Sequence, residues 1–360
     1  MDRIHNFSAG PAVLPESVIR EAQEDLWSHA GSGLGICECS HRSPQFDEVI
    51  DNARDRIHRL LGCDADQEVL FLHGGARTQF FMLPMNLLRG GRATYIDTGK
   101  WSDGAIDDAK LYGTVDVPFS SKSTNYDRVP GPGTLPAVPD GTVYLHYTSN
   151  NTVAGTEFHH IPDAGSAWLA CDMSSDFLSR PVDGSKFSFI YAGAQKNVGP
   201  SGTTVVVIRK SLLEHCDTAL PPMLRYGLHV KKGSMYNTPA TFPIYVIEKV
   251  TAWIEAQGGL EAVEARNVAQ ANAIYGVVDG SDFWSGKAER ASRSLMNVTF
   301  TTGDDDRDMR FVKEAAAAGL SGLKGHRSVG GLRASIYNAQ TDAAVETLVS
   351  FMHDFEKRNG

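Results

Sequence analysis

The sequence lacks a long apolar segment, a basic cluster and any repeated or low-complexity tract. No apolar run approaches the ~18 residues of a membrane span, and the N-terminus has no apolar targeting core. The net charge is −9, which makes nucleic acid and anionic membrane surfaces unfavourable partners. We therefore expect a protein that binds neither nucleic acid nor membrane.

Cysteine is also scarce, with five residues scattered along the chain. Cys37 and Cys39 are separated by one residue, and no second pair exists to complete a zinc site. An odd number of scattered cysteines favours reduced structural thiols. We predict no metal site and a cytoplasmic location.

The chain has 360 residues, which is too long for one simple core and indicates two domains. Its hydrophobic fraction of 42% and charged fraction of 21% are typical of a globular protein. We predict an N-terminal arm over 1–15, a large domain over 16–257 and a small domain over 258–360. The boundary follows a helix predicted at 242–256, which Gly258-Gly259 would end.

The hydrophobic pattern of the large domain alternates between strands and helices. Apolar strands are predicted at 69–72, 94–96, 114–119, 142–147, 167–171, 187–191 and 203–208, and helices at 15–26, 44–61, 78–88 and 101–112. This alternation predicts an α/β fold with a largely parallel sheet flanked by helices. The small domain reads as α+β, with strands near 296–300 and 331–337 and helices near 260–275, 306–318 and from 341.

Lys196 lies between two of the predicted strands, in the stretch Tyr191-Ala-Gly-Ala-Gln-Lys-Asn-Val-Gly-Pro-Ser-Gly202. Burial disfavours the charged ammonium, lowers its pKa and makes the amine a nucleophile suited to an aldehyde. Glycines around it let the backbone approach a ligand closely. A surface lysine in a glycine-rich turn is the alternative that this stretch alone leaves open.

Other polar or aromatic groups also follow predicted strands, where ligands of open parallel sheets bind. Gly74-Gly75-Ala76-Arg77 leads into a helix and suits a phosphate, although a tight turn has the same appearance. Trp101 suits stacking on a flat ring or a place in the core. Thr148-Ser-Asn-Asn-Thr152 offers hydrogen bonds or forms a turn, and Asp172 is either a helix cap or a paired carboxylate.

Together these groups supply a phosphate cup, a stacking ring, a carboxylate and an amine. That combination is typical of a pyridoxal 5'-phosphate site, where a carboxylate holds the pyridine nitrogen protonated and a lysine binds the aldehyde.

A set of motifs then gives the chain a specific resemblance. In order they are Phe7-Ser-Ala-Gly-Pro11, Ser40-His-Arg42, His73-Gly-Gly-Ala-Arg77, Tyr191-Ala-Gly-Ala-Gln-Lys196, Tyr236-Asn-Thr-Pro239, Gly325-His-Arg327 and Gly330-Gly-Leu-Arg-Ala-Ser-Ile-Tyr-Asn338. From residue 6 to the terminal helix, the chain resembles the phosphoserine aminotransferases, class V enzymes of fold-type I.

The resemblance implies a role for each matching residue. Lys196 would bind the cofactor aldehyde, Asp172 the pyridine nitrogen, Trp101 the ring face and Thr152 the phenolic oxygen. The phosphate would be held by the Ala76 and Arg77 amides, by Gln195, and by Asn237 and Thr238 of a second subunit. Ala76 stands where the family commonly has a third glycine. Because the contact with the phosphate uses the backbone amide, we expect no loss of phosphate binding from this difference.

The implied substrates are glutamate, phosphoserine, 3-phosphohydroxypyruvate and 2-oxoglutarate, exchanged in a ping-pong reaction of serine synthesis. Arginine forks suit carboxylate and phosphate alike. Arg333 matches the anchor of the α-carboxylate. The pocket for the side-chain anion is matched by His41, Arg42, Arg77, His326 and Arg327, some of them supplied across a homodimer. The resemblance also raises a second substrate, in pyridoxine synthesis.

Two rival interpretations remain at this stage. A fold-type I transaminase for a small acid would not need several cationic residues around the substrate side chain. A protein that stores or senses pyridoxal phosphate would bind the cofactor without turnover, and the intact set of Asp172, Lys196 and Arg333 weighs against it.

Overall fold

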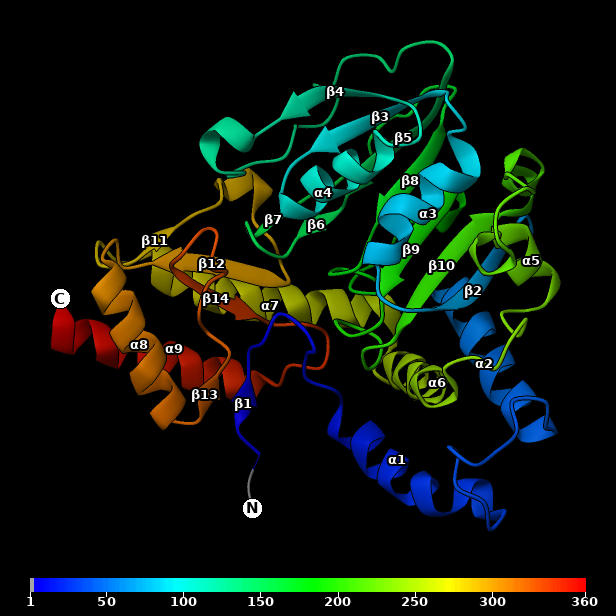
Figure 1. The fold of residues 1–360 in the computed structure, drawn as a ribbon. Helices are drawn as coiled ribbons and strands as arrows, with labels where there is room; N and C mark the ends of the chain where they lie inside the picture. Colours follow the sequence, from blue (N-terminus) through cyan, green and yellow to red (C-terminus); the bar gives the residue numbers. More distant parts are fainter. Residues whose placement is uncertain (1–2) are drawn as a thin grey trace.

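A seven-stranded sheet forms the centre of the protein in this computed structural model, which describes residues 3–360. The strand order is β2-β10-β9-β8-β5-β3-β4 (Figure 1). The bounds are β2 (Gln67–His73), β3 (Arg92–Asp97), β4 (Thr114–Ser120), β5 (Thr142–Thr148), β8 (Trp168–Asp172), β9 (Phe189–Gly193) and β10 (Thr203–Arg209). The predicted α/β fold is therefore confirmed.

One strand departs from the parallel arrangement. β10 runs antiparallel to both of its neighbours, β2 and β9, while the other pairs are parallel. The connection 194–202 between β9 and β10 is too short for a parallel crossover, which needs about a dozen residues. It can only reverse the chain, and this reversal places Lys196 just beyond the carboxyl end of β9.

Helices cover both faces of the sheet. One face packs against α1 (Glu16–Ser28), α2 (Pro44–Leu60) and α6 (Thr241–Ala256), and the other against α3 (Arg77–Leu87), α4 (Lys100–Ala109) and α5 (Tyr226–Lys231). In β2, Val69 and Phe71 point to the first face and Leu70 and Leu72 to the second. The continuous apolar strands of the sequence follow from burial on both faces.

The C-terminal part contains α7 (Gly259–Asp279), β11 (Ser285–Gly286), β12 (Asn297–Thr301), α8 (Asp305–Ala317), β13 (Leu320–Ser321), β14 (Leu332–Ser335) and α9 (Asp342–Asn359). β11, β12 and β14 form an antiparallel sheet. Its core is aromatic and includes Trp284, Phe300, Phe311 and Phe355. The N-terminal strand β1 (His5–Asn6) pairs with β13, and Phe7 is buried in this second core.

Helix α7 contributes to both cores, with Leu260 and Val263 in the first and Ala271 in the second. The domain bounds given above stay a prediction. Within residues 3–360, no helix is both long and apolar enough to cross a membrane, and none of the five cysteines forms a disulfide.

A short hairpin joins the two parts. β6 (Asn150–Asn151) and β7 (Thr156–Glu157) follow β5 and pack against β12. Asn150 donates to Asn297 Oδ1 at 2.7 Å, and Thr299 donates to the Ala154 carbonyl at 2.9 Å. A Cβ on Gly155 would lie 2.4 Å from Thr299 Oγ1, so only glycine allows this approach. The hairpin fixes the position of Thr152 beyond the carboxyl end of β5.

Candidate active site

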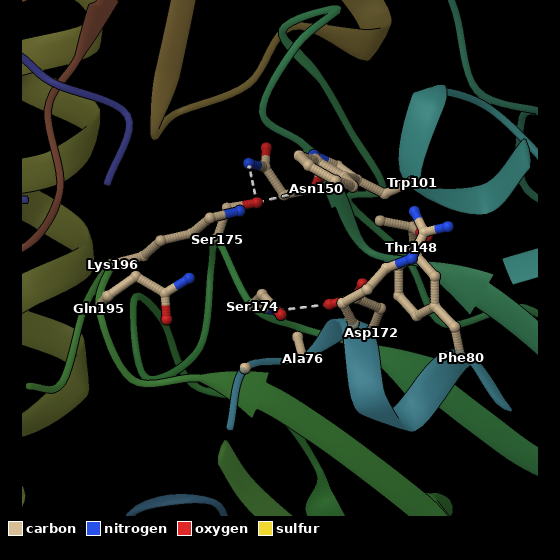
Figure 2. A pocket seen from close by; sticks show the side chains of 12 residues that line it. Ala76, Phe80, Trp101, Thr148, Asn150, Asp172, Ser174, Ser175, Gln195 and Lys196 are labelled. Atoms are coloured by element: carbon tan, nitrogen blue, oxygen red, sulfur yellow. Dashed lines mark hydrogen bonds between the residues drawn. The ribbon is translucent and has the colours of Figure 1, made fainter. Parts of the chain in front are cut away.

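A cavity of about 570 Å³, open solvent included, lies at the carboxyl ends of β2, β5 and β8 (Figure 2). Six residues selected from the sequence line it: Ala76, Arg77, Trp101, Asp172, Gln195 and Lys196. They lie at or after the ends of separate strands, and the sheet order brings those strand ends together. The structure therefore places the predicted cup, ring, carboxylate and amine in one cavity.

Lys196 projects into this cavity from the β9–β10 connection. Its Nζ donates to Thr152 Oγ1 at 2.6 Å and lies 5.9 Å from the centre of the Trp101 ring. Although the residue is partly accessible through the cavity, burial of the amine lowers the pKa of Lys196 to about 8. The Asp172 carboxylate opposes this shift, and the Arg333 guanidinium adds to it. The amine is therefore partly neutral near neutral pH and able to act as a nucleophile.

Asp172 is the last residue of β8 and is buried. Its Oδ1 accepts the backbone N–H of Ser174 at 2.9 Å. Burial raises the pKa of Asp172, and the Ser174 hydrogen bond and the charge of Lys196 partly offset that rise. A buried carboxylate with so few partners is suited to pairing with a protonated ring nitrogen.

The turn after β2 ends at α3, which begins at Arg77. Gly74 has φ +97°, a conformation that favours glycine and turns the chain sharply into the helix. The first amide N–H groups of a helix have no intrahelical acceptor, and they attract anions. With Gln195 facing the same cavity (Figure 2), this corner fits a phosphate group.

Two cavity residues carry buried polar atoms without a partner in residues 3–360. They are the indole Nε1 of Trp101 and the hydroxyl of Thr148. Native proteins rarely leave buried polar atoms unpaired unless a ligand or water completes them. An aromatic face, unsatisfied polar atoms, a buried acid and an anion corner together fit a flat phosphorylated ring such as pyridoxal phosphate.

Arg333 enters from the C-terminal part, on β14. Its Nη1 donates to the Thr152 carbonyl at 2.9 Å, while Nε is buried with no partner in the described chain. Burial lowers the pKa of Arg333. Thr152 thus contacts both Lys196 and Arg333, and the guanidinium keeps donors available for an anion.

Of the predicted substrate residues, Arg77 lines this cavity, while Arg333, His41, Arg42, His326 and Arg327 lie outside its lining. His326 and Arg327 occupy the loop before β14, where burial and the charges of Lys100 and Arg333 lower the pKa of His326. The guanidinium of Arg77 is exposed, 5.0 Å from the Phe80 ring centre and 3.9 Å from Asp108.

His41 and Arg42 lie between α1 and α2. Asn237 and Thr238 contact His73, whose Nε2 is 2.9 Å from the Thr238 carbonyl. Contributions of these four residues to a site of a second subunit stay predictions.

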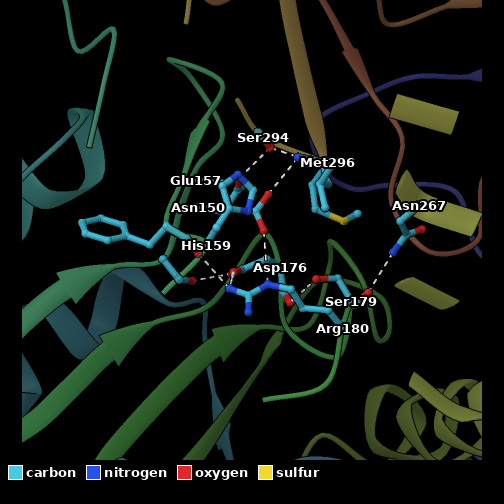
Figure 3. A network of polar contacts seen from close by, with 12 residues as sticks. Asn150, Glu157, His159, Asp176, Ser179, Arg180, Asn267, Ser294 and Met296 are labelled. Atoms are coloured by element: carbon cyan, nitrogen blue, oxygen red, sulfur yellow. Dashed lines mark hydrogen bonds and ion pairs between the residues drawn. The ribbon is translucent and has the colours of Figure 1, made fainter. Parts of the chain in front are cut away.

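The sequence interpretation missed a buried acid pair behind the site (Figure 3). Glu157 and Asp176 flank Arg180, with Glu157 Oε1 3.4 Å from Nε and Asp176 Oδ2 3.9 Å from Nη2. Ser149 donates to Asp176, and the Leu295 N–H donates to Glu157 at 2.8 Å. Two carboxylates share one guanidinium, and burial with mutual repulsion raises the pKa of Asp176 to about 7.

Gly10 and Lys100 were missed as well. A Cβ on Gly10 would lie 3.5 Å from Lys196 Cγ, so the N-terminal arm covers the lysine stem. The motif Phe7-Ser-Ala-Gly-Pro11 signalled that segment, but not its contact. Lys100 directly precedes Trp101 at the start of α4, and its charge helps to lower the pKa of His326.

The fold and the cavity define a fold-type I, cofactor-dependent transferase. The sequence matches the family described as Aminotransferase class-V over residues 4–348. The chain belongs to this family and is an aminotransferase.

Several relatives are more specific. A phosphoserine aminotransferase of Desulfatibacillum aliphaticivorans is 52% identical, covering 100% of this chain and 99% of that protein. One from Nitrosomonas europaea is 48% identical over the whole of both chains. The structure of phosphoserine aminotransferase from Bacillus circulans subsp. alkalophilus superposes with a TM-score of 0.97 at 46% identity over the whole of both chains. A pyridoxal-phosphate-bound phosphoserine aminotransferase from Trichomonas vaginalis gives 0.92 at 37% identity, covering 98% and 100%.

Proposed function

We propose that this aminotransferase binds pyridoxal 5'-phosphate and exchanges an amino group between L-glutamate and 3-phosphohydroxypyruvate, giving 2-oxoglutarate and O-phospho-L-serine. The observation that carries the proposal is the meeting of Lys196, Asp172 and Trp101 in one cavity. Full-length similarity to phosphoserine aminotransferases at 48–52% identity supports the substrate pair. The reaction is a step of serine biosynthesis.

The cofactor, when bound, supplies an aldehyde for the amino group and an electron-withdrawing ring. Lys196 would bind the aldehyde, Trp101 would stack on the ring and Asp172 would pair with the ring nitrogen. Thr152 would donate to the phenolic oxygen. The Ala76 and Arg77 amides and Gln195 would hold the phosphate of this chain's cofactor.

With cofactor and substrate bound, the Lys196 amine would act as the proton carrier. It would take the proton from the substrate Cα as a general base and give it up again as a general acid. A pKa of about 8 suits both directions, since the amine is partly neutral and partly charged at working pH. The second half of the reaction runs the same transfer in reverse on the 2-oxo acid.

Substrate anions are held by cationic side chains. Arg333 binds the α-carboxylate, because its unpaired Nε and remaining donors lie beside Thr152 and Lys196. The side-chain carboxylate or phosphate is held by His41, Arg42, Arg77, His326 and Arg327. Several cations in one pocket suit a phosphate better than the neutral side chain of a small-acid substrate.

The working form proposed is a homodimer with shared sites. Asn237 and Thr238, which pack on His73 in their own chain, would complete the phosphate cup of the partner's cofactor. The five unpaired cysteines are compatible with the proposed cytoplasmic location.

A spectral titration tests this function. The holoenzyme should lose its visible absorbance on adding glutamate or phosphoserine, and recover it with 2-oxoglutarate. Alanine at equal concentration is the comparison for a small-acid transaminase. The phosphorylated four-carbon amino acid of pyridoxine synthesis also carries a phosphate and an α-carboxylate, so the same titration tests it as the proposed second substrate. An unchanged spectrum with every amino acid would favour a cofactor-binding protein without turnover.

A further inference from the structure

The loop that carries His326 and Arg327 is tightly closed on itself. Gly325 N–H donates to the Gly331 carbonyl at 2.8 Å, and Lys324 and Leu332 form an isolated bridge at its base. Gly330 and Gly331 have φ of +62° and +67°, so the chain turns through two left-handed residues. Such a turn restricts the loop but does not fix the orientation of each peptide plane.

Lys287 contacts this loop from outside. It directly follows β11, and its Nζ donates to the Val329 carbonyl at 2.6 Å and to the Gly330 carbonyl at 3.0 Å. A Cβ on Gly331 would lie 2.7 Å from Nζ, so the ammonium packs directly on the loop backbone. Hydrogen bonds from an ammonium are stronger than neutral ones.

One peptide unit couples Lys287 to His326. The Val329 carbonyl accepts from Lys287, while the N–H of the same peptide, on Gly330, donates to the His326 carbonyl at 2.9 Å. The C=O and N–H of a trans peptide point in opposite directions. This peptide plane is therefore held by a hydrogen bond on each side, one to Lys287 and one to the carbonyl of His326. Its orientation links the position of the Lys287 ammonium to that of the His326 backbone.

The charged surroundings of Lys287 are mixed. Burial lowers the pKa of Lys287, and Asp305 and Asp308 oppose that shift. A cavity lined by Lys287, Ser328, Val329 and Asp127 adjoins the contact, so Lys287 and Val329 lie beside open space. The Lys287 ammonium is the charged group that donates to the Val329 and Gly330 carbonyls.

We propose that Lys287 is a positioning residue that holds the segment 325–331 so that His326 and Arg327 face the anionic side chain of the substrate. The inference rests on the proposed function for the roles of His326 and Arg327. The contact itself is independent of that function. Lys287 touches neither the cavity of Lys196 nor the residues assigned to the cofactor.

Hydrogen exchange of the holoenzyme tests the contact directly. In Lys287→Met, which keeps the aliphatic length, the amides of Gly325, Val329 and Gly330 should exchange about 10- to 100-fold faster than in the wild type. Lys287→Arg, which restores two donors, should return toward wild-type exchange. Lys313→Met, an exposed lysine of α8, is the matched control and should leave the segment unchanged.

Steady-state kinetics test the consequence. Lys287→Met should raise the KM for phosphoserine by roughly 10-fold, with kcat nearly unchanged, because the loss is in binding the side chain. Unchanged exchange in Lys287→Met would overturn the proposal, and so would faster exchange without a rise in KM. A wild-type enzyme that does not use phosphoserine would instead refute the proposed function, with the exchange comparison still deciding the contact.

Discussion

Lys196 donates its hydrogen bond to the hydroxyl of Thr152 at 2.6 Å, and this bond joins the lysine to the hairpin between β5 and β8. The backbone carbonyl of Thr152 accepts from Arg333 at 2.9 Å. Lys196 and Arg333, the proposed proton carrier and α-carboxylate anchor, come from different parts of the chain and are therefore set relative to one another by a single residue.

Replacing Lys196 should abolish transamination without unfolding the protein. Lys196→Ala removes the only amine among the residues lining the cavity, and with it the covalent bond to the aldehyde. Turnover should fall by at least the ~10²–10⁴-fold that a positioned acid–base group contributes. Visible absorbance and turnover are measured beside far-UV circular dichroism, which should stay as in the wild type. Turnover at the wild-type rate would refute the role of Lys196.

The depressed pKa of Lys196 has a kinetic consequence. Burial lowers it to about 8, so in protein freed of cofactor the neutral amine accumulates as the pH rises through 8. The rate of absorbance recovery on adding pyridoxal phosphate should rise from pH 6 and level off above about 8. A rate that keeps rising toward pH 10 would show that the amine is solvated like an ordinary lysine.

Arg333 should serve both amino acids alike. Glutamate and phosphoserine each carry an α-carboxylate, and a hydrogen bond to a charged group contributes about 1.5–3 kcal/mol. Arg333→Ala should therefore weaken the binding of each by roughly 10- to 150-fold. Half-reaction titrations with the two amino acids measure this. Alanine, which lacks a side-chain anion, separates the roles, because its binding should weaken in Arg333→Ala and not in Arg327→Ala. An effect of Arg333→Ala confined to phosphoserine would reverse the pocket assignments.

The elements with strong periodicity could be predicted from the sequence. The α2 stripe of Phe46, Val49, Ile50 and Ile57 is buried as expected, and the apolar strands of the sheet form where their runs occur. The antiparallel direction of β10 was not predicted. The apolar pattern of a strand does not indicate its direction, which here follows from the short length of the β9–β10 connection. The helix expected at 101–112 ends at Ala109, where Gly113 must approach the Gly91 carbonyl.

The predicted residues that meet in the cavity follow the carboxyl ends of strands, where parallel topology gathers them. Lys287 and the Asp176–Glu157 pair were missed for a different reason. Lys287 acts on carbonyls about forty residues away, and Glu157 meets Asp176 only after the hairpin folds back. Their significance lies in contacts between distant segments, which residue type and spacing do not encode.

The acid pair makes stability depend on pH. Burial and the charge of Glu157 raise the pKa of Asp176 from 3.8 to about 7, although Arg180 opposes the shift. The folded state then binds more protons than the unfolded state between these values, so the free energy of unfolding falls as pH rises through that window. The destabilisation caused by ionising buried Asp176 is absent below about pH 4 and reaches its full size above about pH 7.

Asp176→Asn should remove this penalty, since the amide cannot ionise and still accepts the Ser149 hydroxyl. The variant's advantage in free energy of unfolding over the wild type should grow by roughly 2–3 kcal/mol as the pH rises from 5 to 8. Urea unfolding at a series of pH values measures the difference, with exposed Asp140→Asn as the control that should show no such trend. If the gain is the same at pH 5 and pH 8, Asp176 does not titrate within this range and its pKa is not raised by burial.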